Sequence, residues 1–529
     1  MTAEPVDVPT EPVRQLSSAW RRCVGTGRMN LSLRRGHREA LALAREEIGF
    51  EMIRGHGMLS DDMGVYREVE WQGERQVRHV FGYLDEVVDS YLATGVRPFL
   101  ELGFMPEALA SGDQTVFWWK GNVTPPRSYP QWQELVRGTL RHLVDRYGID
   151  EVRTWPIEVW NEPNLTDFWQ GADQEEYLRL YEATAHAVKE VDAELQVGGP
   201  VLSPGADQWW APFAEFVARR DVPVDFVSRH AYTSGPAQHV PFGVYQDLRP
   251  PQHLLEQFAA PAQHLAGTAL AGLPVHISEF NTSYRPDNPV HDTAYNAAYL
   301  APVLAAGGEH VDSFAYWTVS DVFEEAGVPA SIFHGGFGLL THGLVRKPTY
   351  HLYAFMARLG DQVLAEGEDH LVTRHADGRL AVLAWQPVDG SPVTAADRHH
   401  VRLSVPVSGP LGAEAERAAA RTGPGSAAPS SEPRTAFVLR RRVNESDGNA
   451  WTAWQQLGRP ASPGARHLDL LHDAARPAVE HSSVAVHGGR VELDLHLAQH
   501  EVTLVEVEAV RDSTPPWLDD TRIPGYGVA

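Results

Sequence analysis

Between residues 20 and 360 the sequence alternates eight short apolar runs with longer segments in which apolar residues recur every three or four positions. The second spacing is typical of amphipathic helices, and short apolar runs are typical of buried strands. The eight runs are 20–27, 50–57, 97–105, 156–163, 195–203, 224–234, 274–284 and 311–321. Eight strand–helix units in succession predict a closed (β/α)8 barrel.

Glycines mark the ends of several helix segments, as in 33–49 and 79–95. Gly49, Gly95 and Gly148 each follow the last apolar-periodic residue. Glycine at that position is typical of a helix C-cap, because it adopts the left-handed conformation without a steric cost. We therefore expect these helices to end there.

After residue 360 the pattern changes to alternating apolar and polar residues, which predicts antiparallel strands. Segment 368–390 reads as a hairpin that turns at Asp377-Gly378. The other strand segments are 399–409, 434–443, 488–498 and 500–510. We expect a barrel over 14–360 and a β-sandwich over 361–510, with residues 1–13 a candidate to pack on the sandwich. Residues 410–433 are rich in Ala, Gly, Pro and Ser and predict a mobile insert, and 511–529 form a C-terminal tail.

Charge and composition exclude several classes of partner. The chain of 529 residues has 69 acidic and 45 basic side chains, a formal charge of −24, which disfavours nucleic acid and anionic membranes. It has no apolar run long enough to span a bilayer and no secretory signal at its start. Cys23, the only cysteine, reads as a core residue and excludes an intramolecular disulfide. These features predict a cytoplasmic protein.

Reactive or aromatic residues stand at five predicted strand ends, where a (β/α)8 barrel places its active site. They are His56, Glu162, His230, Glu279 and Trp317. Glu162 lies in WNEPN at the fourth strand end and Glu279 in SEFNTSY at the seventh, so a closed barrel can bring them face to face across its mouth. Glycoside hydrolysis needs such a pair, one carboxyl to protonate the leaving oxygen and one carboxylate to attack the anomeric carbon.

Five motifs resemble glycoside hydrolase family 39, in particular its β-xylosidase branch. They are EVWNEPNL, ISEFNTSY, SRHAYTS, YWTVSDVFEE and FHGGFGL. The resemblance covers residues 20 to 510 approximately. It implies a retaining exo-acting β-xylosidase that releases xylose from the non-reducing end of short xylo-oligosaccharides, and a homo-oligomer, since members of the family are often tetramers.

The resemblance also implies roles for residues next to the carboxylate pair. Glu162 corresponds to the general acid/base and Glu279 to the nucleophile. Asn161 resembles the residue that holds the sugar 2-hydroxyl, and His230 and Tyr232 resemble donors that keep Glu279 ionised.

A second group resembles the sugar-binding residues of the family. Trp317 resembles a platform beneath the sugar, and His56 is a candidate donor to it. Glu324, with Glu325 as a second candidate, resembles an acceptor for the outer hydroxyls. Tyr284, which closes the SEFNTSY motif, is a further candidate for substrate binding.

Each candidate has a structural alternative, such as an ion pair for a carboxylate and core packing for His230, Tyr232 or Trp317. Trp118 and Trp119 could line an entrance subsite or simply pack. Arg54, Glu101 and Glu158 lie within strands that should be apolar in a parallel barrel, so we interpret them as a buried ion network under the site.

No Gly-rich phosphate loop or zinc spacing is present, so we expect no cofactor and no metal. His399-His400 reads as a solvated strand end. Three rival functions remain open: an α-L-iduronidase, another β-glycosidase on the same scaffold, and a sugar-binding protein without catalysis. An iduronide carries a carboxylate and favours added Arg or Lys, whereas the strand-end motifs are neutral and acidic. Retention of both Glu162 and Glu279 argues against a purely binding role.

Overall fold

The computed structural model of the chain describes residues 4–391, 399–407, 435–510, 515 and 517–525. Its centre is a closed barrel of eight parallel strands, which confirms the predicted fold class. Around the barrel the strands are β3 (Cys23–Arg28), β4 (Met52–His56), β7 (Arg97–Leu102), β10 (Pro156–Val159), β11 (Gln196–Leu202), β12 (Phe226–Tyr232), β15 (Val275–Asn281) and β16 (Ser313–Tyr316). Seven of them lie within a predicted run, and β3 extends one residue beyond the first run, to Arg28.

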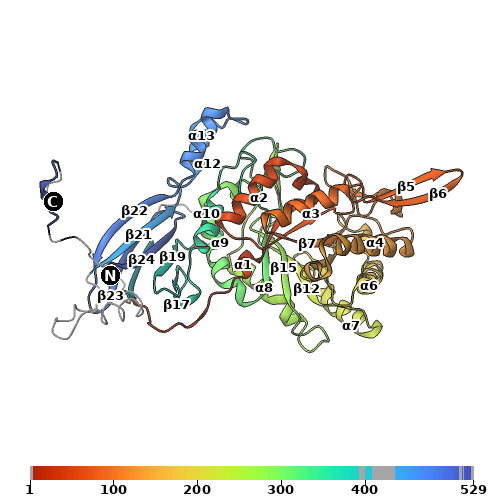
Figure 1. Cartoon of the computed structure of the whole chain (residues 1–529), viewed down its shortest axis with the longest axis horizontal. Helices are drawn as coiled ribbons and strands as arrows, with labels where there is room; N and C mark the ends of the chain where they lie inside the picture. Colours follow the sequence, from red (N-terminus) through yellow and green to blue (C-terminus); the bar gives the residue numbers. More distant parts are fainter. Residues whose placement is uncertain (1–3, 392–398, 408–434, 511–514, 516, 526–529) are drawn as a thin grey trace.

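A ring of helices surrounds the barrel, one after each strand (Figure 1). They are α2 (Arg35–Glu47), α3 (Gly82–Thr94), α4 (Tyr129–Tyr147), α6 (Gln174–Val191), α7 (Trp210–Arg220), α8 (Gln252–His264), α9 (Ala294–Ala306) and α10 (Pro348–Met356). Local sequence sets their limits. The Asp173 side chain caps α6 by accepting a hydrogen bond from the Glu176 amide, and α3 ends at Gly95, whose φ is 80°.

The C-terminal region forms two sheets whose strands pair antiparallel, as predicted, except that β1 runs parallel to β20. The larger has the order β2-β17-β18-β19-β24-β21-β22, and the smaller β1-β20-β23. Their bounds are β1 (Val6–Asp7), β2 (Arg14–Gln15), β17 (Gln362–Glu366), β18 (His370–Arg374), β19 (Leu380–Trp385), β20 (His399–Pro406), β21 (Thr435–Val443), β22 (Ala478–Ala485), β23 (Arg490–Leu497) and β24 (Val502–Val510). β17 and β22 were not predicted, and the short N-terminal strands β1 and β2 pair with β20 and β17.

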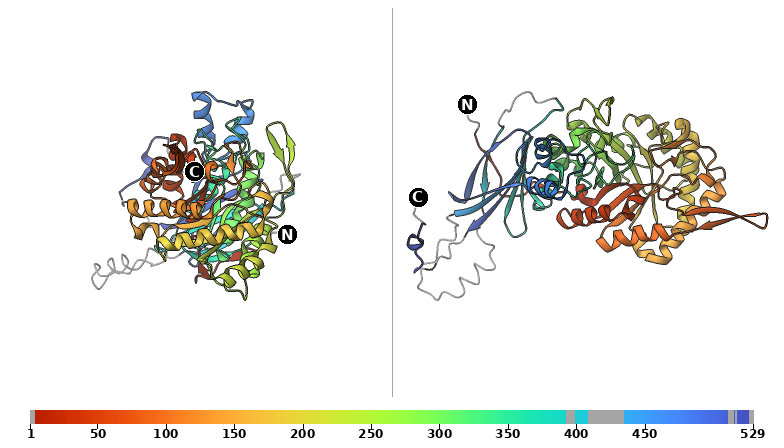
Figure 2. Two further views of the ribbon diagram at one scale, coloured as in Figure 1. Left: turned by 90° about the vertical axis from the view of Figure 1, so that its right-hand side faces the viewer. Right: turned by 90° about the horizontal axis from the view of Figure 1, so that it is seen from above.

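The larger sheet is covered on both faces. It is therefore a middle layer of the molecule, and not an outer layer of a separate two-sheet sandwich. In β19, Ala381, Leu383 and Trp385 join the core that includes the barrel helices, whereas Leu380 and Val382 join the core between the two sheets. Helices α9 and α10 pack against β24. The sheet therefore lies between barrel helices and the second sheet, and the view from above shows the resulting elongated molecule (Figure 2).

Two further features depart from the predicted pattern. Helices α12 (Ala450–Gln456) and α13 (Ala465–Ala474) interrupt the sandwich, and their apolar residues pack on Ile332 and Phe333 from the barrel domain. The loop after β4 forms a hairpin, β5 (Tyr66–Trp71) and β6 (Glu74–His79), that projects from the barrel in Figures 1 and 2.

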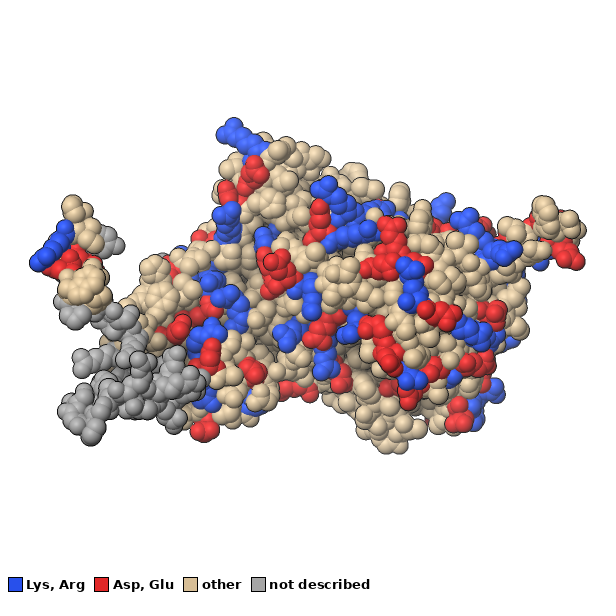
Figure 3. Space-filling model, viewed as in Figure 1, with Lys and Arg blue, Asp and Glu red and all other residues tan. Residues whose placement is uncertain are grey.

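On the face shown in Figure 3, acidic and basic side chains are intermingled. Among the described helices, none combines the length and the apolar character that crossing a bilayer requires. The predicted insert at 410–433 lies outside the described residues, and of the tail at 511–529 only 515 and 517–525 are described.

Candidate active site

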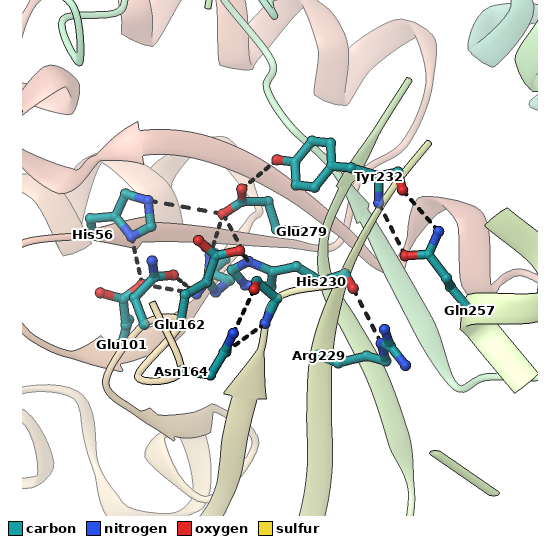
Figure 4. Close-up of polar contacts among 12 residues, drawn as sticks. His56, Glu101, Glu162, Asn164, Arg229, His230, Tyr232, Gln257 and Glu279 are labelled. Atoms are coloured by element: carbon teal, nitrogen blue, oxygen red, sulfur yellow. Dashed lines mark hydrogen bonds and ion pairs between the residues drawn. The ribbon is translucent and has the colours of Figure 1, made fainter. Parts of the chain in front are cut away.

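The side chains predicted from the strand ends converge at one end of the barrel. Glu162 follows β10, while His56, His230, Tyr232 and Glu279 lie in β4, β12 and β15. All five are buried. Figure 4 shows Glu162, Glu279, His56 and His230 turned toward one another. The carboxyl ends of the parallel strands therefore bring together residues that are far apart in the sequence.

Glu162 sits in a strained turn directly after β10, with a φ of 43°. Its amide donates a hydrogen bond to the Val201 carbonyl, with 3.0 Å between nitrogen and oxygen. Its Oε1 lies 2.9 Å from Nδ1 of His230. Burial, and the negative charge of Glu279 nearby, raise the pKa of Glu162 well above its ordinary value. Glu162 is therefore suited to hold a proton near neutral pH.

Glu279 has more donors around it. Its Oε1 accepts a hydrogen bond from the Tyr232 hydroxyl, and its Oε2 lies 3.2 Å from a guanidinium nitrogen of Arg54. Burial raises the pKa of Glu279 as well, but the charges of Arg54 and His56 and the Tyr232 hydrogen bond oppose that rise. Of the two carboxyls, Glu279 is the one whose surroundings favour the charged form.

His230 stands between the two carboxyls. Its Nδ1 lies 2.9 Å from Oε1 of Glu162 and 3.6 Å from Oε2 of Glu279. Burial and the positive charge of Arg54 lower the pKa of His230 well below its usual value. A neutral imidazole adds no positive charge beside Glu162, so it does not favour the ionised form of the Glu162 carboxyl over the protonated form.

Arg54 is the centre of the ion network predicted beneath the site. Its guanidinium lies 2.6 Å from Glu158 and 2.9 Å from Glu101, and it also donates to Oδ1 of Asn161 at 2.9 Å. Arg54, Glu101 and Glu158 have no exposed side-chain surface. Because Arg54 contacts Glu279 too, one buried cation fixes both the carboxylate and the Asn161 amide.

An aromatic wall closes one side of the site. The Trp317 ring is buried, and its centroid lies 4.7 Å from that of His56. His56 in turn places its Nδ1 2.7 Å from Glu101 and its Nε2 3.9 Å from Glu279. Tyr284 is 44% exposed, and its backbone amide donates to the Ser234 hydroxyl. The structure therefore places Trp317 and His56 in the site and Tyr284 on exposed surface.

The two neighbouring glutamates of the loop after β16 point in different directions. Glu324 forms ion pairs with Arg28 and Arg34, whereas Oε1 of Glu325 lies 3.9 Å from Nε2 of His56. Burial and the charges of Glu279 and Glu162 raise the pKa of Glu325 well above its ordinary value. The sequence ranked Glu324 ahead of Glu325, and no local pattern distinguishes two consecutive glutamates in an irregular loop.

One group of three side chains among the described residues could hold a metal ion. It consists of His400 on β20 and of Asp494 and His496 on β23, and all three lie on the outer face of the small sheet. His400 already pairs with Asp494, and none of the three belongs to the barrel. His399, beside it, pairs with Asp369 at 2.7 Å.

The sequence matches the model of the family described as "Glycosyl hydrolases family 39" over residues 6–418. A "Beta-xylosidase" from Geobacillus stearothermophilus is 47% identical over 98% of this chain and 99% of that protein. A "Beta-xylosidase" from Caldicellulosiruptor saccharolyticus is 34% identical over 93% of this chain and 96% of that protein. Among solved structures, a monomeric β-xylosidase from Caulobacter crescentus CB15 has a TM-score of 0.82 at 29% identity, covering 96% of this chain and 100% of that chain. These matches extend through the barrel and the sandwich.

Proposed function

Because the chain belongs to glycosyl hydrolase family 39, we propose that it is a β-xylosidase that releases xylose from the non-reducing end of short xylo-oligosaccharides with retention of configuration. The observation that carries this proposal is the pairing of Glu162 and Glu279 on either side of His230. The two relatives called β-xylosidases, which match over nearly their whole length, support the choice of sugar.

In the first step Glu279 attacks the anomeric carbon. A bond forms between its carboxylate oxygen and that carbon while the glycosidic bond breaks, and the proton of Glu162 passes to the leaving oxygen. The Arg54 charge and the Tyr232 hydrogen bond hold Glu279 as the nucleophile. Burial of Glu162 keeps the proton available.

In the second step water attacks the anomeric carbon of the glycosyl-enzyme. Glu162, now ionised, accepts a proton from the water, and the bond to Glu279 breaks. Two inversions give net retention. A retaining pair is about 5–5.5 Å apart, and an inverting pair about 6.5–9.5 Å. The short distances from Nδ1 of His230 to both carboxyls support the closer arrangement.

The residues around the pair supply contacts for one sugar ring. Trp317 offers an aromatic face, and Asn161, held by Arg54, is placed to bind the 2-hydroxyl. His56 and Glu325 face the same space and are the proposed partners of the outer hydroxyls. Tyr284 is proposed as a contact at the rim. The position of the Glu325 side chain near His56 supports its inclusion among the proposed sugar-binding residues.

The charge of the site supports a neutral sugar over a uronate. A uronate would bring a carboxylate close to Glu279 and Glu325, and like charges in a poorly solvated site cost several kcal/mol, roughly, unless a cation offsets them. Arg285 is the cation whose charge acts on Glu325, but it also pairs with Asp287 at 3.3 Å. A hexose adds only a CH2OH group, which a pocket rejects by roughly 10–200-fold.

The decisive experiment measures kcat/KM of purified protein for nitrophenyl β-xyloside, β-glucoside, β-galactoside, α-arabinoside and α-iduronide under one condition. We expect the xyloside to be best, the hexosides slow and the iduronide inert. Proton NMR should show β-xylose as the first product. An iduronide as good as the xyloside, or a first-formed α-anomer, would overturn the proposal, and no turnover of any glycoside would favour a binding protein.

Cellular location and assembly are parts of the same proposal. Cys23, which is buried and free, is compatible with the proposed cytoplasmic location. The resemblance to the family supports a homo-oligomer, although the Caulobacter relative is described as monomeric. Cell fractionation and light scattering of the purified chain test the two statements separately.

A further inference from the structure

The loop that follows β16 is fixed by an ion cluster on the side that faces away from Glu325. Oε2 of Glu324 lies 2.7 Å from Nη2 of Arg28, and Oε1 lies 2.7 Å from Nη2 of Arg34. The Glu324 side chain is only 11% exposed. Both of its oxygens are thus taken by guanidinium groups from the end of β3 and from the segment that follows it.

Arg28 is itself held in place. It lies at the end of β3 and is 8% exposed, with Nη1 paired to Asp62 and the guanidinium 5.2 Å from the Trp119 ring centroid. A buried guanidinium with several partners has one favoured geometry, because moving it would leave charges unpaired in a poorly solvated environment. Arg28 therefore provides a fixed attachment point for Glu324.

The side chains of Phe323 and Glu325, on either side of Glu324, face away from the ion cluster. Phe323 is buried edge-on against Trp317, with 6.2 Å between the ring centroids. The Glu325 carbonyl accepts a hydrogen bond from the Trp118 amide at 2.8 Å, and its side chain turns toward His56. The segment from Phe323 to Glu325 thus alternates between the site and the ion cluster.

We propose that Glu324 is a positioning residue, whose ion pairs with Arg28 and Arg34 hold the loop so that Glu325 projects into the sugar-binding site. This inference rests on the proposed function, in which Glu325 contacts the sugar. In this proposal Glu324 acts through Glu325, because each of its oxygens already pairs with a guanidinium of the ion cluster. The ion cluster connects the loop after β16 to the loop after β3, and so joins the last strand of the barrel to the first.

A double-mutant cycle separates this role from direct sugar binding. Glu324→Gln keeps the shape of the side chain but removes the charge that binds both arginines. We expect it to lower kcat/KM for nitrophenyl β-xyloside by about 10- to 100-fold, since misplacing a substrate-positioning group by about 1 Å has effects of that size. Combined with Glu325→Gln, it should cause no loss beyond that of Glu325→Gln alone, within roughly twofold.

Additive losses in the double variant would overturn the proposal, because Glu324 would then act independently of Glu325. So would wild-type kinetics for Glu324→Gln. If Glu324→Gln does not fold, as judged by its Tm, the cycle is run with Arg34→Gln, which removes a partly exposed partner of the same carboxylate. The control is Glu39→Gln, which breaks the exposed Arg35–Glu39 pair on α2 and should leave kcat/KM unchanged. A wild-type protein without glycosidase activity would instead refute the proposed function.

Discussion

Glu162 and Glu279 are chemically identical side chains in different environments, and this difference supports their proposed roles. Glu162 is buried beside a neutral imidazole, and Glu279 beside a guanidinium and a phenol. Burial acts on both, so the donors make the difference.

Removing each carboxylate should have a different consequence. Glu279→Ala should abolish turnover, and azide should restore a product of inverted configuration, because azide then attacks from the face that Glu279 occupied. Glu162→Ala should slow poor leaving groups by about 10²–10⁴-fold and activated aryl ones much less. Steady-state kinetics and NMR of the azide adduct measure both. Glu175→Ala, an exposed carboxylate of α6, serves as control. Lack of an inverted adduct would contradict the assignment of Glu279.

The pH profile should respond to Tyr232. The proposed mechanism needs Glu279 ionised and Glu162 protonated, so we expect kcat/KM to fall at low pH as Glu279 gains a proton and at high pH as Glu162 loses one. Tyr232→Phe removes a donor that lowers the pKa of Glu279, so the acid limb should move to higher pH. Tyr66→Phe, which removes a similar hydrogen bond to Glu68 at the projecting hairpin, should not move it. An unmoved or lowered acid limb in Tyr232→Phe would count against the role of Tyr232.

Gly25 leaves room for the Trp317 ring. A Cβ atom at Gly25 would lie 2.3 Å from Cε3 of Trp317, closer than carbon atoms approach. Gly25→Ala should therefore displace the ring and lower kcat/KM for the xyloside by about 10²-fold. In α2, Gly36→Ala would place a Cβ at an ordinary 3.6 Å from Val322 and should leave activity unchanged. Equal activity of the two variants would show that the ring position is unimportant.

The sequence predicts some of these residues better than others. Glu162 and Glu279 stand in motifs at strand ends, so barrel geometry alone brings them together. The choice between Glu324 and Glu325 depends on Arg28 and Arg34, almost 300 positions earlier in the chain. Contacts between residues so far apart in the chain leave no periodic signal in the sequence. The sequence therefore does not predict the direction of either glutamate side chain.

At the scale of elements, strand β19 shows what a sequence pattern can and cannot tell. Its six residues, LAVLAW, are all buried, as expected of a strand covered on both faces. The hairpin with β18 was predicted, but not the three-layer packing that buries both faces. By contrast, β22 is mostly exposed and lacks clear alternation, so no sequence pattern predicts it.

Both faces of β19 should contribute to stability. Leu383 faces the barrel helices and Leu380 faces the second sheet, and each is at most 2% exposed. Leu383→Ala and Leu380→Ala should each lower the free energy of unfolding by about 2–5 kcal/mol. Phe437→Ala, at a site 39% exposed on β21, should have a much smaller effect. Denaturant or thermal unfolding measures the loss of stability. If Leu383→Ala leaves the free energy of unfolding unchanged, the face of β19 toward the barrel helices is not a packed interface.

At the scale of the whole molecule, the barrel and the larger sheet share one hydrophobic core. The ring of Tyr295 in α9 packs edge-on against the ring of His500. Nε2 of His351 in α10 lies 2.6 Å from the Ala475 carbonyl oxygen beside α13. The barrel domain was predictable from its repeated strand–helix units. Its attachment to the sandwich was not predictable. An amphipathic helix shows the same apolar periodicity whether its apolar face packs on neighbouring helices or on a sheet.

A fragment that ends at residue 360 should therefore fail to fold. It would expose the apolar faces of α9 and α10 that pack on β24 in the intact chain. We expect an insoluble fragment, or a soluble one without a cooperative thermal transition, when it is compared with the full chain by circular dichroism. A fragment with a sharp transition and full xylosidase activity would show that the barrel is independent.

Strand β24, the last strand among the described residues, lies in the larger sheet between β19 and β21. During synthesis on the ribosome, the barrel sequence emerges long before this strand does. At 5–20 residues per second, the roughly 150 residues between the two take about 8–30 s to be made. Until then β19 and β21 have no strand between them, and the apolar faces of α9 and α10 have no cover. We therefore expect the nascent chain to be most prone to aggregation after its barrel is complete. A message truncated just before β24 would yield a protein that holds every proposed active-site residue yet cannot close its core.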